Sequence, residues 1–199
     1  MRRQIYGDIY DDSMWLIDLV ENLLSVTRIE EGRMQIRQSA ELVDEVIKEA
    51  LKHTGQSRTG RTIKVEEEDE LILAKMDARL IVQVLINLIG NAVKYTPQGT
   101  DITVRVKKEK AENAERSQVI ISVCDLGNGI PDDRKERVFD MFYTGSDQVA
   151  DSRRSLGLGL GLCRSIINAH EGKIWISDNI PHGAVVTFTL PAEEVALNE

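Results

Sequence analysis

Arg79 to Pro97 reads RLIVQVLINLIGNAVKYTP, a stretch that predicts one long apolar helix with a single polar stripe. Asn87, Asn91 and Lys94 follow one another at helical spacing, so their side chains share one face. The surrounding Ile, Val and Leu residues place the two amides half inside an apolar core. Because an unsatisfied buried amide costs about 1–3 kcal/mol, each asparagine needs a partner from the protein, from water or from a ligand.

Two interpretations of this stripe are open on spacing alone. Amide oxygens suit a hard cation such as Mg²⁺, and a lysine supplies a point charge for phosphate, which together would make a metal and phosphate site. The alternative is structural, with both asparagines bonded to neighbouring loops. Other segments of the chain must decide between the two.

Two glycine-containing segments favour the ligand. The first, DLGNGI at residues 125–130, follows an apolar strand, so its glycines let the backbone approach a flat ligand near the Asp125 carboxylate. The second, GLGLGL at residues 157–162, opens a helix, where free N–H groups and the helix dipole favour phosphate. Its spacing is GxGxG rather than the GxGxxG of dinucleotide sites, and no βαβ unit follows it. Each segment alone is a weak signal.

Hydrophobic periodicity predicts the elements around these segments. We expect Asp77 to cap the helix at residues 79–95, His53 to begin a polar loop, and a hairpin with a long polar tip to follow the helix. The predicted class is α/β, as a two-layer α+β sandwich in which helices cover one face of a mixed sheet. The other helices are expected at 42–51, about 132–142 and about 159–170, and the strands at 63–65, 71–73, 102–106, 119–124, 173–177 and 185–190.

The first 32 residues differ from the rest. Ile9, Leu16 and Leu23 recur every seven residues, and further apolar residues widen their stripe beyond what one neighbouring helix would cover. We therefore expect residues 1–32 to form a bundle helix whose partner is absent from this sequence, and residues 33–199 to form the sandwich domain. A helix packed on its own domain is the alternative.

Composition narrows the class of protein. Of 199 residues, 42% are hydrophobic, which excludes a disordered chain, and the net charge of −8 disfavours non-specific nucleic-acid binding. Cys124 and Cys163 lie in apolar segments far apart, which is typical of reduced core thiols. Such thiols indicate a cytosolic compartment. No apolar run reaches the roughly 18 residues of a membrane span, so this chain is expected outside the membrane.

Taken together, these segments resemble the ATP-binding domain of the sensor histidine kinases of two-component systems. The resemblance covers nearly the whole chain, and five ordered motifs are far more specific than one. Residues 19–32 resemble the second helix of the dimerisation and phosphoacceptor hairpin, and residues 91–95 and 162–166 resemble the potassium-responsive Kdp-type kinases. The motifs are the N box at 87–97, the two glycine boxes at 125–130 and 157–160, the F box at 139–142 and the closing strand at 183–191.

The resemblance implies the Bergerat fold, with ATP and Mg²⁺ as ligands. It implies that Asn91 binds the metal, that Asn87 and Lys94 approach the phosphates, that Tyr95 lies along the adenine, and that Asp125 accepts from the adenine amino group. Residues 143–156 would form a lid, whose Arg153 and Arg154 could contact phosphate and whose start would be anchored by the packing of Phe139 and Phe142. The remaining ATP-site residues that it implies are Gly127, Gly129, Ile130, Phe142, Gly157, Leu158, Gly159, Leu160 and Thr187.

Three departures from the family pattern matter. The phosphoacceptor motif is absent, and neither His53, His170 nor His182 has its context, so the acceptor histidine is expected outside this sequence. Ser155 occupies the first glycine position of the second glycine box, and Gly161 is an extra glycine. The implied partners are the phosphoacceptor hairpin and a response regulator, in a homodimeric parent protein anchored to a membrane.

Two other functions remain as alternatives. An ATPase of the gyrase B, Hsp90 or MutL type would carry a glutamate where this chain has Asn87, and an amide cannot act as a general base. A non-catalytic nucleotide-binding or dimerisation module would use ATP only to rigidify the lid.

Overall fold

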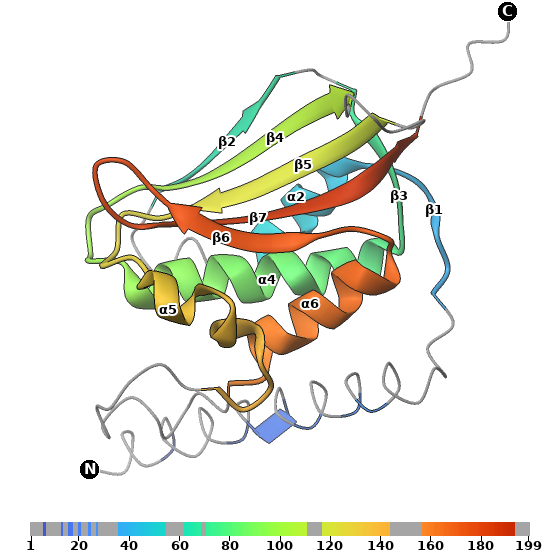
Figure 1. Cartoon of the computed structure of the whole chain (residues 1–199). Coiled ribbons are helices and arrows are strands. Elements are labelled where there is room, and N and C mark those ends of the chain that lie inside the picture. Colours follow the sequence, from blue (N-terminus) through green and yellow to red (C-terminus); the bar gives the residue numbers. More distant parts are fainter. Residues whose placement is uncertain are drawn as a thin grey trace, which may run out of the picture.

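A computed structural model describes residues 36–54, 62–68, 71–110, 117–143 and 157–193 (Figure 1). It also describes seven isolated positions between residues 6 and 27, all of them helical and exposed. These positions agree with a helix near the start of the chain. The expected boundary between residues 32 and 33 lies outside the described residues, and the division into two domains stays a prediction.

A mixed sheet of seven strands forms one layer, as the sequence predicts. Its order is β1-β3-β7-β5-β4-β2, and off this path β6 pairs with residues 184–188 of β7, ahead of the residues that pair with β3. Strands β2 and β4 run parallel, and the other pairs are antiparallel. The strands are β1 (Ser39–Leu42), β2 (Ile63–Glu67), β3 (Leu73–Met76), β4 (Ile102–Lys110), β5 (Ser117–Cys124), β6 (Ile174–Asp178) and β7 (Ala184–Glu193).

Helices form the second layer on one face of this sheet (Figure 1). The long α4 (Ala78–Tyr95) contacts both α2 (Val43–His53) and α6 (Gly159–Ala169), while the short α5 (Asp132–Lys135) and a 3₁₀ turn (Arg137–Phe139) follow β5. Alternate residues of the strands, such as Val104 and Phe188, are fully buried against the helices. No helix among the described residues is long and apolar enough to cross a membrane.

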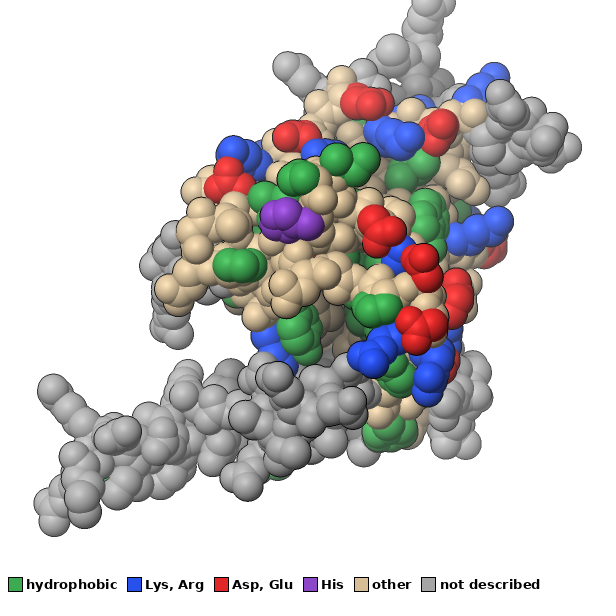
Figure 2. All heavy atoms as spheres, turned by 60° about the vertical axis from the view of Figure 1, so that its left-hand side comes forward, with side chains coloured by type: hydrophobic (Ala, Val, Ile, Leu, Met, Phe, Trp, Pro, Cys, Tyr) green, Lys and Arg blue, Asp and Glu red, His purple; other side chains and the backbone are tan. Residues whose placement is uncertain are grey.

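The other face of the sheet carries polar side chains. One row crosses five strands, because register aligns residues on β2, β4, β5, β7 and β6 in turn. Its members are Glu66, Arg105, Ser122, Thr187 and Trp175. Figure 2 shows acidic and basic side chains interspersed over one side of the molecule.

Several elements differ from the sequence prediction. The helix expected at about 132–142 is the four-residue α5 followed by the 3₁₀ turn that ends at Phe139. Strand β1 was not expected, because its short edge segment SAEL has no apolar alternation and is stabilised by pairing with β3. Strand β3 lies two residues later than predicted, because Ile72, Ala74 and Met76 are the alternate positions buried against the helices.

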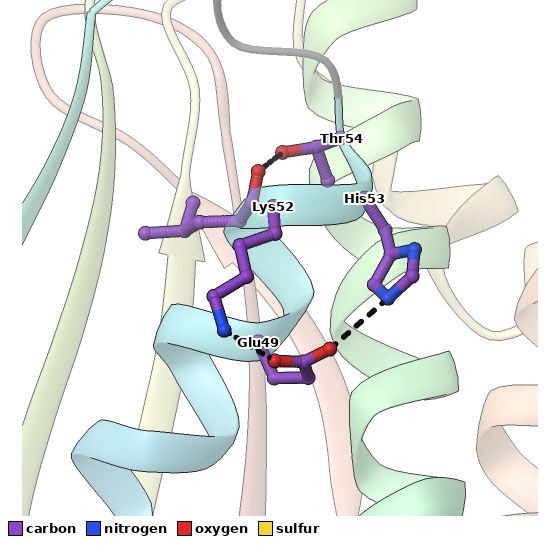
Figure 3. Close-up of polar contacts among 5 residues, drawn as sticks. Glu49, Lys52, His53 and Thr54 are labelled. Atoms are coloured by element: carbon purple, nitrogen blue, oxygen red, sulfur yellow. Dashed lines mark hydrogen bonds and ion pairs between the residues drawn. The ribbon is translucent and has the colours of Figure 1, made fainter.

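The polar loop predicted from His53 begins later, since His53 is the last residue of α2 (Figure 3). Lys52 donates to Glu49 Oε2 at 2.7 Å, and His53 Nε2 lies 3.3 Å from Glu49 Oε1. These contacts on the last helical turn hold the pKa of Glu49 below its usual value, with the Lys52 hydrogen bond contributing most. Basic residues at the C-terminal end of a helix also interact favourably with the helix dipole.

Asp77 precedes α4 as predicted, but its carboxylate does not cap the helix. Instead, Asp77 Oδ2 accepts from the backbone N–H of Arg37 at 3.2 Å, which joins the start of α4 to the segment before β1. The N–H of Asp77 donates to Nε2 of the fully buried His170 at 3.0 Å. His170 Nδ1 lies 2.8 Å from the Ile166 carbonyl, which fixes it as the donor and Nε2 as the acceptor.

Candidate functional site

The Asp125 carboxylate lies immediately after β5 and is held by backbone groups. Its Oδ1 accepts from the N–H of Gly127 at 2.8 Å and of Ala184 at 3.2 Å. Its own N–H donates to the Ala184 carbonyl at 2.9 Å. Among the described residues no hydrogen bond reaches Oδ2, so a carboxylate in a fixed orientation keeps one oxygen for a donor from a ligand.

The loop after Asp125 closes onto the end of α4. A Cβ atom at Gly127 would lie 2.7 Å from the Tyr95 carbonyl oxygen and 2.9 Å from Asp125 Oδ1, so only glycine fits there. The Lys94 ammonium lies 5.0 Å from the centroid of the Tyr95 ring, and that ring is 56% exposed. The structure therefore brings the predicted Tyr95, Lys94 and Asp125 to the same end of the sandwich.

Asn87 lies further from the C-terminal end of α4 than Lys94 and Tyr95, at the point where α4 meets the start of α6. A Cβ atom at Gly159 would lie 3.6 Å from Asn87 Oδ1, so the second glycine box packs against this amide. Asn87 Nδ2 is buried and has no hydrogen-bond partner within the described part of the chain. An orphaned buried amide next to a helix N-terminus fits the ligand interpretation better than the structural one.

Both cysteines are free and buried, as the sequence predicts. Burial raises the pKa of the Cys163 thiol to about 12, while the adjacent Asn87 amide acts in the opposite direction. Burial also raises the pKa of Cys124, on β5. Both groups are therefore neutral thiols at neutral pH.

The predicted lid begins and ends at one place. The N–H of Phe142 donates to the Gly157 carbonyl at 3.0 Å, and a Cβ atom at Gly157 would lie within 2.7 Å of Phe142 and Tyr143 backbone atoms. The positive φ of Gly157 gives a second reason for glycine here. Arg153 and Arg154 lie outside the described residues, as does Ser155.

The packing predicted for the start of the lid is half correct. Phe139 is 2% exposed and is a core residue, but Phe142 is 63% exposed and anchors nothing by packing. A φ of 65° at Phe142 turns its side chain away from the core. Gly161, the extra glycine, has a packing reason, because a Cβ atom there would lie 3.2 Å from both Met141 and the Phe139 carbonyl.

Thr187 is not brought to the site. It pairs with Ser122 across β5 and β7, and its Oγ1 lies 3.0 Å from Ser122 Oγ. Ser122 is three residues before Asp125, and side chains alternate along a strand, so Thr187 and Asp125 lie on opposite faces of the sheet. We therefore leave Thr187 out of the site.

The apolar residues of the glycine boxes have their side chains in the protein. Leu158 is 4% exposed, and Ile130 and Leu160 pack around Phe139. The contribution that we expect from Leu158 to a ligand is therefore made by its backbone, whereas Ile130 and Leu160 are only partly buried. Gly129 takes a positive φ of 72°, as its place in the loop requires.

The sequence did not indicate two further residues, both in the turn between β6 and β7. Asn179 Nδ2 donates to the Asp125 carbonyl at 2.7 Å, and His182 Nδ1 lies 3.2 Å from the Gly127 carbonyl. Each contact joins residues more than fifty positions apart, so no short-range pattern signals it.

Residues 76–194 match the family model described as histidine kinase-, DNA gyrase B-, and HSP90-like ATPase. The chain belongs to this family, and within it to the catalytic domains of the sensor histidine kinases. It is 39% identical over 192 residues to the sensor protein KdpD of Clostridium acetobutylicum, which covers 96% of this chain and 21% of KdpD. The predicted family and the resemblance to Kdp-type kinases are confirmed.

Solved structures of histidine kinases resemble this chain in fold. The catalytic domain of the histidine kinase ThkA, in a nucleotide-free form, is 30% identical and superposes with a TM-score of 0.62 over 78% of this chain and 95% of ThkA. Full-length ShkA in complex with AMPPNP is 22% identical, with a TM-score of 0.73 over 96% of this chain and 39% of ShkA, and shows the shared fold. The chain spans about a fifth to a half of the length of the relatives KdpD and SasA.

Proposed function

We propose that this chain binds ATP with Mg²⁺ and acts as the catalytic domain that transfers the γ-phosphoryl group to a histidine outside this sequence. The observation that carries the proposal is the Asp125 carboxylate, fixed through Oδ1 and without a described partner at Oδ2, beside the end of α4. An acceptor fixed in this way fits the exocyclic amino group of adenine. The Tyr95 ring, exposed at the same end, can lie along the base.

The phosphates would lie toward the start of α6. Backbone N–H groups at Gly157 and Gly159 and the dipole of α6 favour negative charge there, and Lys94 adds a positive charge from α4. Arg153 and Arg154 remain proposed phosphate contacts from the lid. The relative ShkA is solved with AMPPNP, an analogue of ATP, which supports this class of ligand.

The donor set fits Mg²⁺ held mainly by phosphate. No group of three or more His, Cys, Asp or Glu side chains among the described residues could form a protein cage for a metal. Mg²⁺ commonly uses one or two protein ligands together with phosphate oxygens and water, and the Asn91 amide is our proposed ligand with Asn87 beside it. When bound, the ion would neutralise charge on the phosphates.

Transfer to a histidine is favoured over hydrolysis. An ATPase needs a base for water, and Asn87, on the face where that base would lie, cannot accept a proton. In the transfer, the bond between the γ-phosphorus and the bridging oxygen breaks, a P–N bond forms to the acceptor imidazole, and ADP leaves. We propose the phosphoacceptor hairpin, a response regulator and a homodimeric, membrane-anchored parent protein as its context.

Asp125→Ala is expected to weaken ATP binding by about 10- to 100-fold, because a charged hydrogen bond of about 1–3 kcal/mol is lost. Isothermal titration calorimetry with ATP and Mg²⁺ measures the change. Asp133→Ala is the matched control, since Asp133 is an exposed carboxylate on α5 and should bind ATP like the wild type. Equal affinities for wild type and Asp125→Ala, or no binding by either, would contradict the proposed site.

The chain alone is expected to gain no phosphohistidine when incubated with γ-labelled ATP and Mg²⁺. His170 is fully buried with both ring nitrogens bonded, and His53 and His182 contact Glu49 and the Gly127 carbonyl. The measurement is acid-labile, alkali-stable label retained on the protein. Such label on any of the three histidines would show that the acceptor lies in this chain.

A further inference from the structure

The turn between β6 and β7 holds the Asp125 loop at two carbonyls. Beyond the contact of His182 with Gly127, the Asn179 amide reaches the Asp125 carbonyl, a group that lies past the end of β5 and outside the sheet ladder. Asn179 is itself fixed. Its N–H donates to the Gly183 carbonyl and its Oδ1 accepts from the N–H of Ile180, both at 3.0 Å, so its Nδ2 is directed at Asp125.

The turn also approaches the loop too closely for other residues. A Cβ atom at Gly183 would lie 2.0 Å from the Asp125 carbonyl oxygen, and one at Gly129 would lie 3.2 Å from the Gly183 carbonyl oxygen. Gly183 has a φ of 112°, which side chains rarely allow. The N–H, the carbonyl and one carboxylate oxygen of Asp125 are thus all fixed by residues 179–184 and Gly127.

We propose that Asn179 is a positioning residue for base selection: by holding the Asp125 carbonyl it aims Oδ2 at the 6-amino group of a purine nucleotide. The inference rests on the proposed nucleotide site. Asn179 itself does not contact the base. Its loss would let the Asp125 carboxylate rotate or shift, and a purine with a 6-amino group would lose its advantage over one with a 6-oxo group.

The test compares ATP with inosine triphosphate, which carries a 6-oxo group, by calorimetry on the 199-residue chain with Mg²⁺. Asn179→Ala is expected to weaken ATP binding about tenfold, which corresponds to one well-aligned hydrogen bond, and to leave the weaker binding of inosine triphosphate nearly unchanged. Asn168→Ala, which removes an exposed asparagine from α6, is the matched control and should keep wild-type selectivity.

A double-mutant cycle separates positioning from a general loss of structure. If Asn179 acts through Asp125, Asn179→Ala should change the selectivity of the Asp125→Ala variant very little. An equal loss for both nucleotides, or additive effects on selectivity, would overturn the inference. His182→Ala provides a second variant if Asn179→Ala does not fold, because His182 is exposed; it should lower selectivity in the same direction, and unchanged selectivity would count against the inference.

Failure of the inference and failure of the proposed function are distinguishable. A wild-type chain that binds neither nucleotide would overturn both. A wild type that selects ATP and depends on Asp125, with Asn179→Ala and His182→Ala indistinguishable from it, would overturn the role of the turn alone.

Discussion

His170→Ala is expected to lower the free energy of unfolding by about 3 kcal/mol, since it removes a fully buried ring and leaves one buried backbone N–H without an acceptor. The N–H of Asp77 loses its acceptor at the start of α4, and the Ile166 carbonyl near the end of α6 loses the ring N–H but keeps the backbone N–H of residue 170. One imidazole thus ties together the two helices that carry the N box and the second glycine box.

Urea denaturation of the wild type, His170→Ala and His53→Ala measures this loss of unfolding free energy. His53 is exposed on the last turn of α2, so its removal should change stability much less. Equal stabilities for His170→Ala and His53→Ala would show that the buried bridge contributes nothing.

The same histidine should make stability depend on pH. Burial lowers the pKa of His170 in the folded protein, and the Asp77 carboxylate acts in the opposite direction. Because the unfolded chain then binds the proton more readily, the contribution of His170 is complete above its unfolded pKa of 6.5 and is lost as pH falls below that value. His170→Phe, which cannot bind a proton, should show a shallower loss of stability below pH of about 6.5, by at most about 1.4 kcal/mol per pH unit.

The central helix and its polar stripe were predictable because their periodicity is local and strong. Asn87 and Asn91 are fixed relative to one another by helical geometry alone, and the apolar residues around them had to face a core. Strand β1 was not predictable in this way. Its four residues gain their structure from the pairing with β3, which is a long-range contact.

The candidate site likewise combines residues that a local sequence pattern predicts with contacts that only the folded chain makes. Asp125 follows a strand that any apolar pattern would find, but the groups that fix it come from Asn179 and Ala184. The face on which Thr187 lies could not be predicted, because motif matching gives no strand register and one position along β7 changes the face. Phe142 was misplaced because a positive φ at an aromatic residue has no sequence signal.

Gly172→Ala is expected to destabilise the fold by at least about 3 kcal/mol, because the added methyl has no room. A Cβ atom there would lie 2.0 Å from the Thr189 carbonyl oxygen on the central strand β7 and 3.0 Å from the Ile167 side chain. Neither the backbone at Gly172 nor the backbone at Thr189 can move easily. The Thr189 N–H donates to the Lys173 carbonyl, and the Gly172 N–H donates to the Ile167 carbonyl.

The neighbouring residue should respond in the opposite direction. Glu171 follows the end of α6 with a φ of 61°, a left-handed conformation that glycine adopts without strain. Glu171→Gly should therefore stabilise the fold by about 0.5–1 kcal/mol, which is the relief of strain less the extra entropy of an unfolded glycine.

Gly90→Ala, at an exposed position of α4 where a Cβ atom meets nothing within 4 Å, should also stabilise the fold by about 0.5–1 kcal/mol. Thermal and urea unfolding of the three variants tests the set, and a Gly172→Ala protein as stable as Gly90→Ala would refute the close approach of the turn after α6 to β7.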